Sequence, residues 1–183
     1  MSGGLGVAAL RGLLEGATQN DVTARQSAEG QLEEAATSSP NQLVCGLVQV
    51  LAAQDVASDL RQVAVLFLRQ LVKGLKGRDS VWGDLEAPAK KMLMDQLLAT
   101  VEHETTRPVQ RNAGLLLSAV ATAVAGDVAE LVRQWPELLP TLSRLAGGTN
   151  RRLASEVLEE LAPAFGDVLM AQGEQVRSAL SAT

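Results

Sequence analysis

The sequence predicts an all-α protein built as a solenoid, in which two-helix units stack on one another. The first observation is compositional: 46% of the 183 residues are hydrophobic, but only 2% are aromatic and none is Tyr. Ala, Leu and Val therefore supply the apolar surface, which favours close helix packing over a β-sandwich. The other two observations are a repeated helical spine and a regular series of helix start and stop signals.

The spine consists of four residues spaced three, four and three apart, so that all four share one face of a helix. It occurs as Arg25-Ala28-Leu32-Ala35, Arg61-Ala64-Leu68-Leu71, Gln110-Ala113-Leu117-Val120 and Arg151-Ala154-Leu158-Leu161. The copies recur irregularly at roughly 40 residues, the period of two-helix solenoid repeats. The alanines are expected to let helices approach closely, and the leucines to fill the space between layers.

Nine helices are expected, with short connections that make successive helices antiparallel neighbours. They cover residues 5–16, 22–36, 40–54, 60–73, 88–102, 108–124, 127–147, 151–163 and 167–181. In pairs they make four hairpins and one further helix, and each spine falls on the second helix of a hairpin. The expected repeats are therefore 5–36, 40–75, 86–124 and 127–164, with 167–181 as the first helix of a fifth.

Local signals place the first four helices. Asn20 or Asp21 can cap the second helix by accepting a free backbone N–H, and Ser39 is expected to cap the third, with Pro40 at its first position. The fourth helix, LRQVAVLFLRQLVK, ends near Gly74. Trp82 lies in the following loop, where we expect it to fill a gap between helices.

Similar signals order the second half of the chain. Asp127, with Glu130 three residues later, resembles a capping box. Trp135-Pro136 predicts a bend or a restart within the seventh helix. Residue 149 or 150 is expected to cap the eighth helix, and Pro163 to stop it.

Composition and residue chemistry weigh against several functions. The net charge of −5 argues against nucleic acid as a partner and is compatible with a basic protein. Cys45 is expected to be a core thiol, and His103 has no second His or Cys with which to bind a metal. No signal peptide and no apolar run of membrane-spanning length is present, so we expect an intracellular protein without a membrane partner.

Catalysis is not expected. The sequence contains no nucleophile–base pair and no phosphate-binding loop. Adjacent glutamates, such as Glu33-Glu34 or Glu159-Glu160, point about 100° apart on a helix and make poor partners for one substrate. We therefore predict no catalytic, cofactor-binding or metal-binding residues, and no cofactor.

Two segments, DVTARQSAEGQLEEA and LRQVAVLFLRQLVKG, carry a resemblance to a known family. The first resembles the opening repeat of importin-β-type nuclear transport receptors, the karyopherin-β family, and the second resembles the second helix of their next repeat. The Trp82 loop with its following Leu-rich helix and the segment QWPELLPTLSRL are similar to later repeats in the same order. The branch that looks most similar is that of importin five and importin four.

The resemblance implies a right-handed α-solenoid of about four HEAT repeats plus one extra helix, forming the N-terminal part of a longer receptor. It also implies binding of Ran-GTP on the concave face, release of cargo, and shuttling between cytoplasm and nucleus. The implied cargo is basic, ribosomal proteins or histones, and a full-length receptor would also bind nucleoporins. The candidate partner-binding residues are Arg25, Glu29, Arg61, Arg69, Gln70, Gln110 and Arg151.

Two alternatives stay open. Arg61 could pair with a carboxylate between layers rather than contact a partner, whereas contact is favoured for Arg69. The whole chain could also be a generic HEAT-repeat scaffold for protein–protein interaction, which would share the spines but need not bind Ran.

Overall fold

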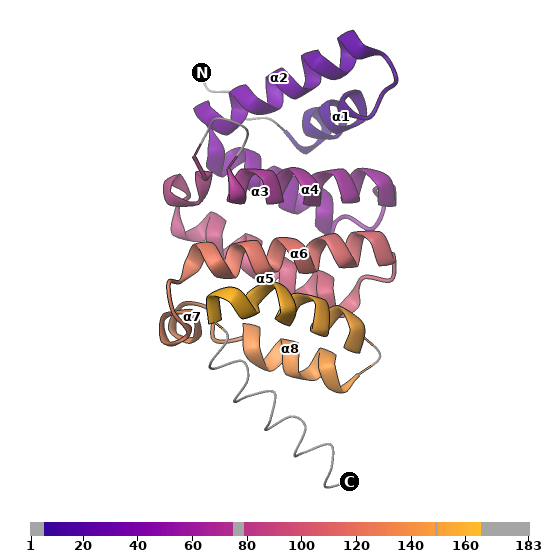
Figure 1. Ribbon diagram of the computed structural model, residues 1–183. Helices are drawn as coiled ribbons and strands as arrows, with labels where there is room; N and C mark the ends of the chain where they lie inside the picture. Colours follow the sequence, from indigo (N-terminus) through magenta and orange to yellow (C-terminus); the bar gives the residue numbers. More distant parts are fainter. Residues whose placement is uncertain (1–5, 75–78, 149, 166–183) are drawn as a thin grey trace, which may run out of the picture.

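The computed structural model describes residues 6–74, 79–148 and 150–165, and over these ranges the chain is an all-helical solenoid without strands (Figure 1). Its elements are α1 (Val7–Ala17), α2 (Val22–Ser38), α3 (Pro40–Ala52), α4 (Ser58–Lys73), the 3-10 turn η1 (Val81–Asp84), α5 (Ala87–His103), α6 (Arg107–Val124), α7 (Val128–Gln134) and α8 (Leu138–Gly147). A further helical segment covers residues 151–165.

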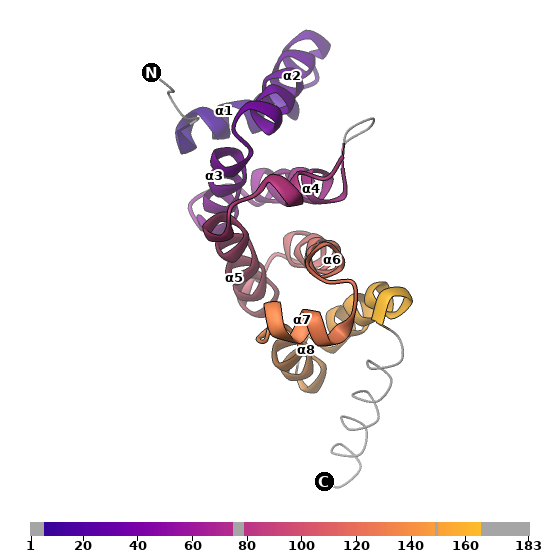
Figure 2. The ribbon, with the colours of Figure 1, turned by 90° about the vertical axis from the view of Figure 1, so that its left-hand side faces the viewer.

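The helices form stacked antiparallel hairpins. α1 packs on α2, α3 on α4, and α5 on α6. The first helices α1, α3 and α5 follow one another in one row, and the second helices α2, α4, α6 and 151–165 in another (Figure 2). The pair α4 and α6 makes the most extensive contact between elements. We call the exposed side of the second row the second-helix face.

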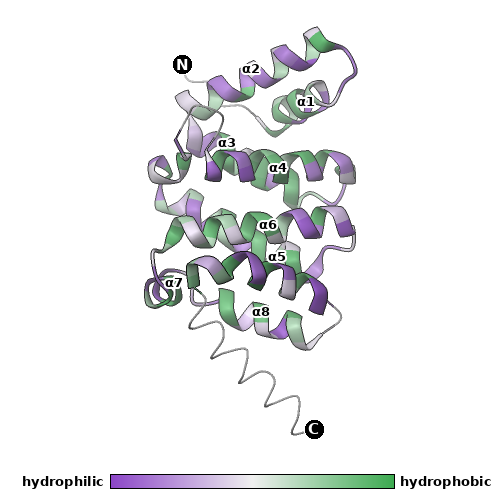
Figure 3. Cartoon of the chain, viewed as in Figure 1, coloured by the Kyte–Doolittle hydropathy of each residue, from purple (hydrophilic) through white to green (hydrophobic). Residues whose placement is uncertain are grey.

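The repeated spine lies at the contacts between helices. Its alanines are all buried, as are the leucines of the first three copies, and only Leu158 in the last copy is half-buried. Small side chains permit the close approach of neighbouring helices, while the leucines bury apolar surface in the resulting grooves. Figure 3 shows more hydrophobic colour along α6, inside the stack, than along α2 at its end.

Most helix termini follow the sequence signals. The Asp21 carboxylate accepts from the backbone N–H groups of Thr23 and Ala24, and the Asp127 carboxylate from that of Glu130. Ser39 occupies the N-cap position of α3 and Pro40 begins the helix, as predicted, but the Ser39 side chain makes no capping hydrogen bond. Gly74 ends α4 with φ of 93°, a left-handed conformation that glycine adopts without steric cost.

One expectation for the last helices is confirmed and another is wrong. The predicted break at Trp135-Pro136 separates α7 from α8. Pro163 does not stop the helical segment, which continues to residue 165. Pro163 is exposed, so the carbonyl that loses its N–H partner there can be hydrated. The predicted helix over 167–181 lies outside the described residues.

Trp82 packs against the core from η1, which contacts α3 and α4. The Lys90 ammonium lies 5.4 Å from the centre of its ring, a cation–π arrangement. Within the described ranges no single helix is long and apolar enough to cross a membrane. α6 and α7 meet the criteria of length and composition only together, and a bend of 107° separates them.

Candidate partner-binding face

An open groove separates α2 from α4 on the second-helix face. We call it the α2–α4 groove; it has a volume of about 490 Å³. Its lining residues come from α2, from α4 and its end, and from the last residue of α1: Glu29, Leu32, Glu33, Val63, Leu66, Phe67, Gln70, Gly74 and Ala17. The groove exists because α2 packs on α1 and α3, whereas α4 packs mainly on α6 and α3.

The α2–α4 groove combines apolar surface with carboxylates. Val63 and Phe67 are half-buried, and Leu66 is 38% exposed, one of few large apolar side chains so accessible. Glu29 and Glu33 add two carboxylates from α2. Accessible apolar area beside polar and charged groups is one feature of protein interaction sites.

Two of the predicted contact residues, Glu29 and Gln70, therefore lie together in this groove. Arg69 does not point the same way as Gln70, because successive helical residues are about 100° apart. The Arg69 Nε atom is enclosed by protein and has no hydrogen-bond partner among the described residues, and no ion pair forms there either. The Arg69 side chain as a whole is half-buried on α4. Arg25, on α2, is half-buried.

The first position of each later spine has a structural role. Arg61 Nε donates to the Val56 carbonyl at 3.2 Å, and Arg151 Nε donates to the Ala146 carbonyl at 3.3 Å, in each case five residues back. Gln110 Nε2 donates to the Val101 carbonyl at 2.9 Å. A polar side chain at this position therefore fixes the preceding turn or helix end.

This finding corrects the predicted site. Arg61 and Gln110 are buried, so they are not available as surface contacts for a partner. Arg151 remains exposed, although its Nε is already engaged. The sequence pattern that suggested a shared binding role reflects the internal hydrogen bonds of the repeat.

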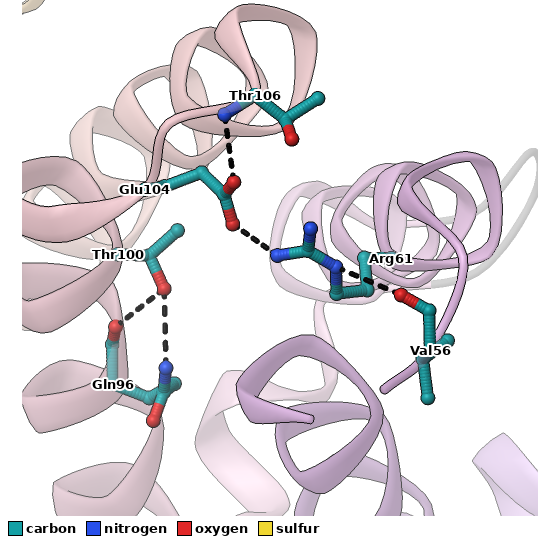
Figure 4. A network of polar contacts seen from close by, with 6 residues as sticks. All are labelled: Val56, Arg61, Gln96, Thr100, Glu104 and Thr106. Atoms are coloured by element: carbon teal, nitrogen blue, oxygen red, sulfur yellow. Dashed lines mark hydrogen bonds and ion pairs between the residues drawn. The ribbon is translucent and has the colours of Figure 1, made fainter. Parts of the chain in front are cut away.

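Arg61 also forms a buried ion pair with Glu104, which follows α5 (Figure 4). The Glu104 carboxylate accepts in addition from the Thr106 backbone N–H at 2.8 Å. Burial raises the pKa of Glu104, but the hydrogen bonds from Thr106 and Arg61 outweigh it, so the pKa lies below its ordinary value. The pair ties the second hairpin to the third and leaves neither charge free for a partner.

The apolar part of the groove was missed from the sequence. Val63, Leu66, Phe67 and Gln70 are spaced three, one and three apart, so they share one side of α4, opposite much of the spine. That second apolar stripe was a readable signal, but in so apolar a helix it could not be told from core.

The described residues offer little support for metal binding or for nucleophilic catalysis. No group of three His, Cys, Asp or Glu side chains there could hold a metal ion. Cys45 is half-buried rather than fully buried, and burial, with a contribution from Glu86, raises the pKa of its thiol. A raised pKa keeps the thiol protonated and a poor nucleophile.

No protein-family model matches the sequence, and no curated protein matches it significantly. Solved structures do match its fold. One is a structure in which Kap95p binding induces the switch loops of RanGDP to adopt the GTP-bound conformation. Its TM-score is 0.73 at 20% sequence identity, and the match covers 87% of this chain and 19% of that chain. Another is importin β in an ammonium sulfate condition, with TM-score 0.70 at 24% identity, covering 84% and 18%.

These likenesses establish an importin-β-like HEAT solenoid as the fold of the chain. The chain spans about a fifth of the length of each of these structures.

Proposed function

We propose that this chain acts as the N-terminal part of a nuclear transport receptor and that its second-helix face binds the GTPase Ran in the GTP state. The observation that carries the proposal is the α2–α4 groove, with accessible Leu66 and Phe67 beside charged residues. Its apolar area can supply binding energy, and its charges can supply orientation and specificity.

The similarity to a Kap95p structure that describes Ran switch loops supports Ran as the partner. Arg69 supports the same assignment, because it is half-buried on α4 and forms no ion pair among the described residues, so its charge can pair with a carboxylate of a partner. Arg25, Glu29, Arg69 and Gln70 are the contact residues of this proposal, with Arg151 as a peripheral one.

Ran binding to these repeats would couple the GTPase state to cargo release, as the family resemblance implies. Further repeats would then carry basic cargo and nucleoporin sites, and the receptor would shuttle between cytoplasm and nucleus. We keep the repeat boundaries 5–36, 40–75, 86–124 and 127–164 as part of this proposal, and likewise the importin five and importin four branch.

The experiment is a pull-down of the purified chain with Ran locked in the GTP or in the GDP form. Preferential capture of the GTP form is expected. Arg69→Glu should weaken that capture by about tenfold, which corresponds to about 1.4 kcal/mol, since a charge reversal turns an attractive contact into a repulsive one.

The matched control is Arg133→Glu. Arg133 lies on α7, pairs with Glu130 and is exposed, so it changes the net charge equally at a distance from the α2–α4 groove. Equal capture of both Ran forms, or equal effects of the two variants, contradicts the proposal. Capture of a different partner without Ran binding would instead support a generic HEAT-repeat scaffold.

A further inference from the structure

A second, basic pocket lies farther along the second-helix face, between the N-terminal ends of α6 and of the 151–165 segment. Its volume is about 250 Å³. Three arginines line it: Arg107 and Arg111 from one helix, and Arg152 from the other. We call it the arginine pocket. It stands out because the chain as a whole has a net charge of −5.

One carboxylate organises the arginine pocket. Glu156 accepts from Arg111 Nε at 3.0 Å and from Arg152 Nε at 3.1 Å. These two hydrogen bonds, from Arg152 first and Arg111 second, lower the pKa of Glu156, so it stays ionised at neutral pH. Glu156 therefore holds two guanidinium groups in place and neutralises only part of their charge.

Most donor capacity in the pocket remains unused. A guanidinium has five N–H donors, and Arg111 and Arg152 each commit only the Nε–H to Glu156. Arg107 has no hydrogen-bond or ion-pair partner among the described residues. The pocket thus presents three positive charges against one negative charge, with outward N–H groups suited to carboxylate oxygens.

We propose that the arginine pocket binds a short acidic segment, rich in Asp or Glu, of a partner protein. A short segment is favoured over nucleic acid because Glu159 and Glu160 border the pocket along the same helix. A few carboxylates can reach the arginines without passing these two glutamates, whereas an extended phosphate backbone would run against them. The positive helix N-termini add to the attraction for carboxylates. The pocket lies apart from the α2–α4 groove and does not depend on Ran binding.

The second-helix face carries opposite charges at its two ends. Carboxylates Glu29 and Glu33 line the groove near its start, and arginines line the pocket near its other end. A partner that covers both would carry basic residues at one end of its surface and acidic residues at the other. Such complementarity sets orientation and speeds association.

The test uses the whole chain and fluorescence anisotropy with a labelled peptide that alternates Glu and Gly. Binding that weakens with added salt is expected, and a peptide with Gln in place of Glu should not bind. The triple variant Arg107→Ala/Arg111→Ala/Arg152→Ala should bind the Glu peptide at least about tenfold more weakly, since it removes all three cations. These side chains are exposed, so the variant should fold, which circular dichroism checks.

The matched control removes the same charge elsewhere, with Lys91→Ala/Arg133→Ala/Arg144→Ala on the first-helix side. It should change affinity by no more than about twofold, a non-specific charge effect. Arg69→Glu should leave peptide binding unchanged, which separates this proposal from Ran binding. The proposal is overturned if both triple variants lose the same affinity for the Glu peptide, or if the folded protein does not bind that peptide. It is also overturned if a short oligothymidine binds more tightly than the Glu peptide.

Discussion

The junction between the second and third hairpins is closed, whereas the junction between the first and second is open on one side. α4 and α6 pack along their length, and the Arg61–Glu104 pair is buried beside them. α1 and α3 also pack closely: a Cβ atom on Gly46 would lie 2.9 Å from Leu10 Cδ2. Their partners α2 and α4 instead diverge and leave the α2–α4 groove.

The difference between the two junctions indicates where a solenoid can bind a partner. Both junctions bury an apolar core, but only the closed one fills the space between its second helices with side chains and a buried ion pair. The first hairpin has no earlier layer among the described residues to hold α2 against α4. Accessible apolar surface therefore accumulates at the end of the stack, and each prediction below tests this contrast.

The largest effect is expected from Arg61→Met, at the closed junction. Removal of the guanidinium leaves Glu104 buried and uncompensated, which should lower the free energy of unfolding by about 3–5 kcal/mol. Urea unfolding followed by circular dichroism measures it. Arg133→Met, which breaks an exposed pair, should cost less than about 1 kcal/mol. Similar small losses in both variants would contradict the structural role of Arg61.

A smaller effect at the same junction is expected on acidification. The pKa of Glu104 in the folded state lies below its ordinary value of 4.5, so the folded protein binds fewer protons than the unfolded chain in that range. The stabilisation is complete above pH 4.5 and is lost as pH falls through the lowered pKa. The difference in unfolding free energy between wild type and Glu104→Gln should therefore be constant near neutrality and shrink below that pH. A pH-independent difference would argue against an ionised Glu104.

Two glycine-to-alanine substitutions should change the free energy of unfolding in opposite directions. A Cβ on Gly114 of α6 would lie 2.9 Å from Leu153 Cδ1 and 3.0 Å from Val157 Cγ2, so Gly114→Ala should destabilise by about 1 kcal/mol through overpacking. A Cβ on Gly30 of α2 would meet nothing within 4 Å. Gly30→Ala should stabilise by roughly 0.5–1 kcal/mol, because it gains helix propensity. Thermal unfolding of both variants compares the close packing of α6 against the 151–165 segment with the open surface of α2.

The smallest effect on stability is expected in the open groove. Leu66→Gln should change the free energy of unfolding by less than about 0.5 kcal/mol, because Leu66 is 38% exposed. Leu68→Ala, two residues away and fully buried, should cost about 2–5 kcal/mol. A large loss for Leu66→Gln would mean that the groove is closed in solution. If Leu66 contacts Ran, the variant should nevertheless lower Ran capture.

Much of the fold could be read from the sequence because helix formation leaves local marks. The spines gave the buried faces of α2, α4 and α6, and Asp21 and Asp127 gave two helix starts. Pro163 was misread, since the cost of a proline depends on whether the freed carbonyl reaches water. The absence of a side-chain cap at Ser39 was equally invisible in the sequence.

The candidate site was predicted only in part. Glu29 and Gln70 line one groove, and their role as contacts stays a prediction. Arg61 and Gln110 occupy the same first position of the spine as Arg25, but they are buried inside the molecule. The sequence fixes which side chains lie on one helical face, because a helix has a constant 3.6-residue period. The distance between neighbouring helices is set by contacts between layers, so only the tertiary structure could decide that α4 and α6 close over Arg61 while α2 and α4 leave a groove.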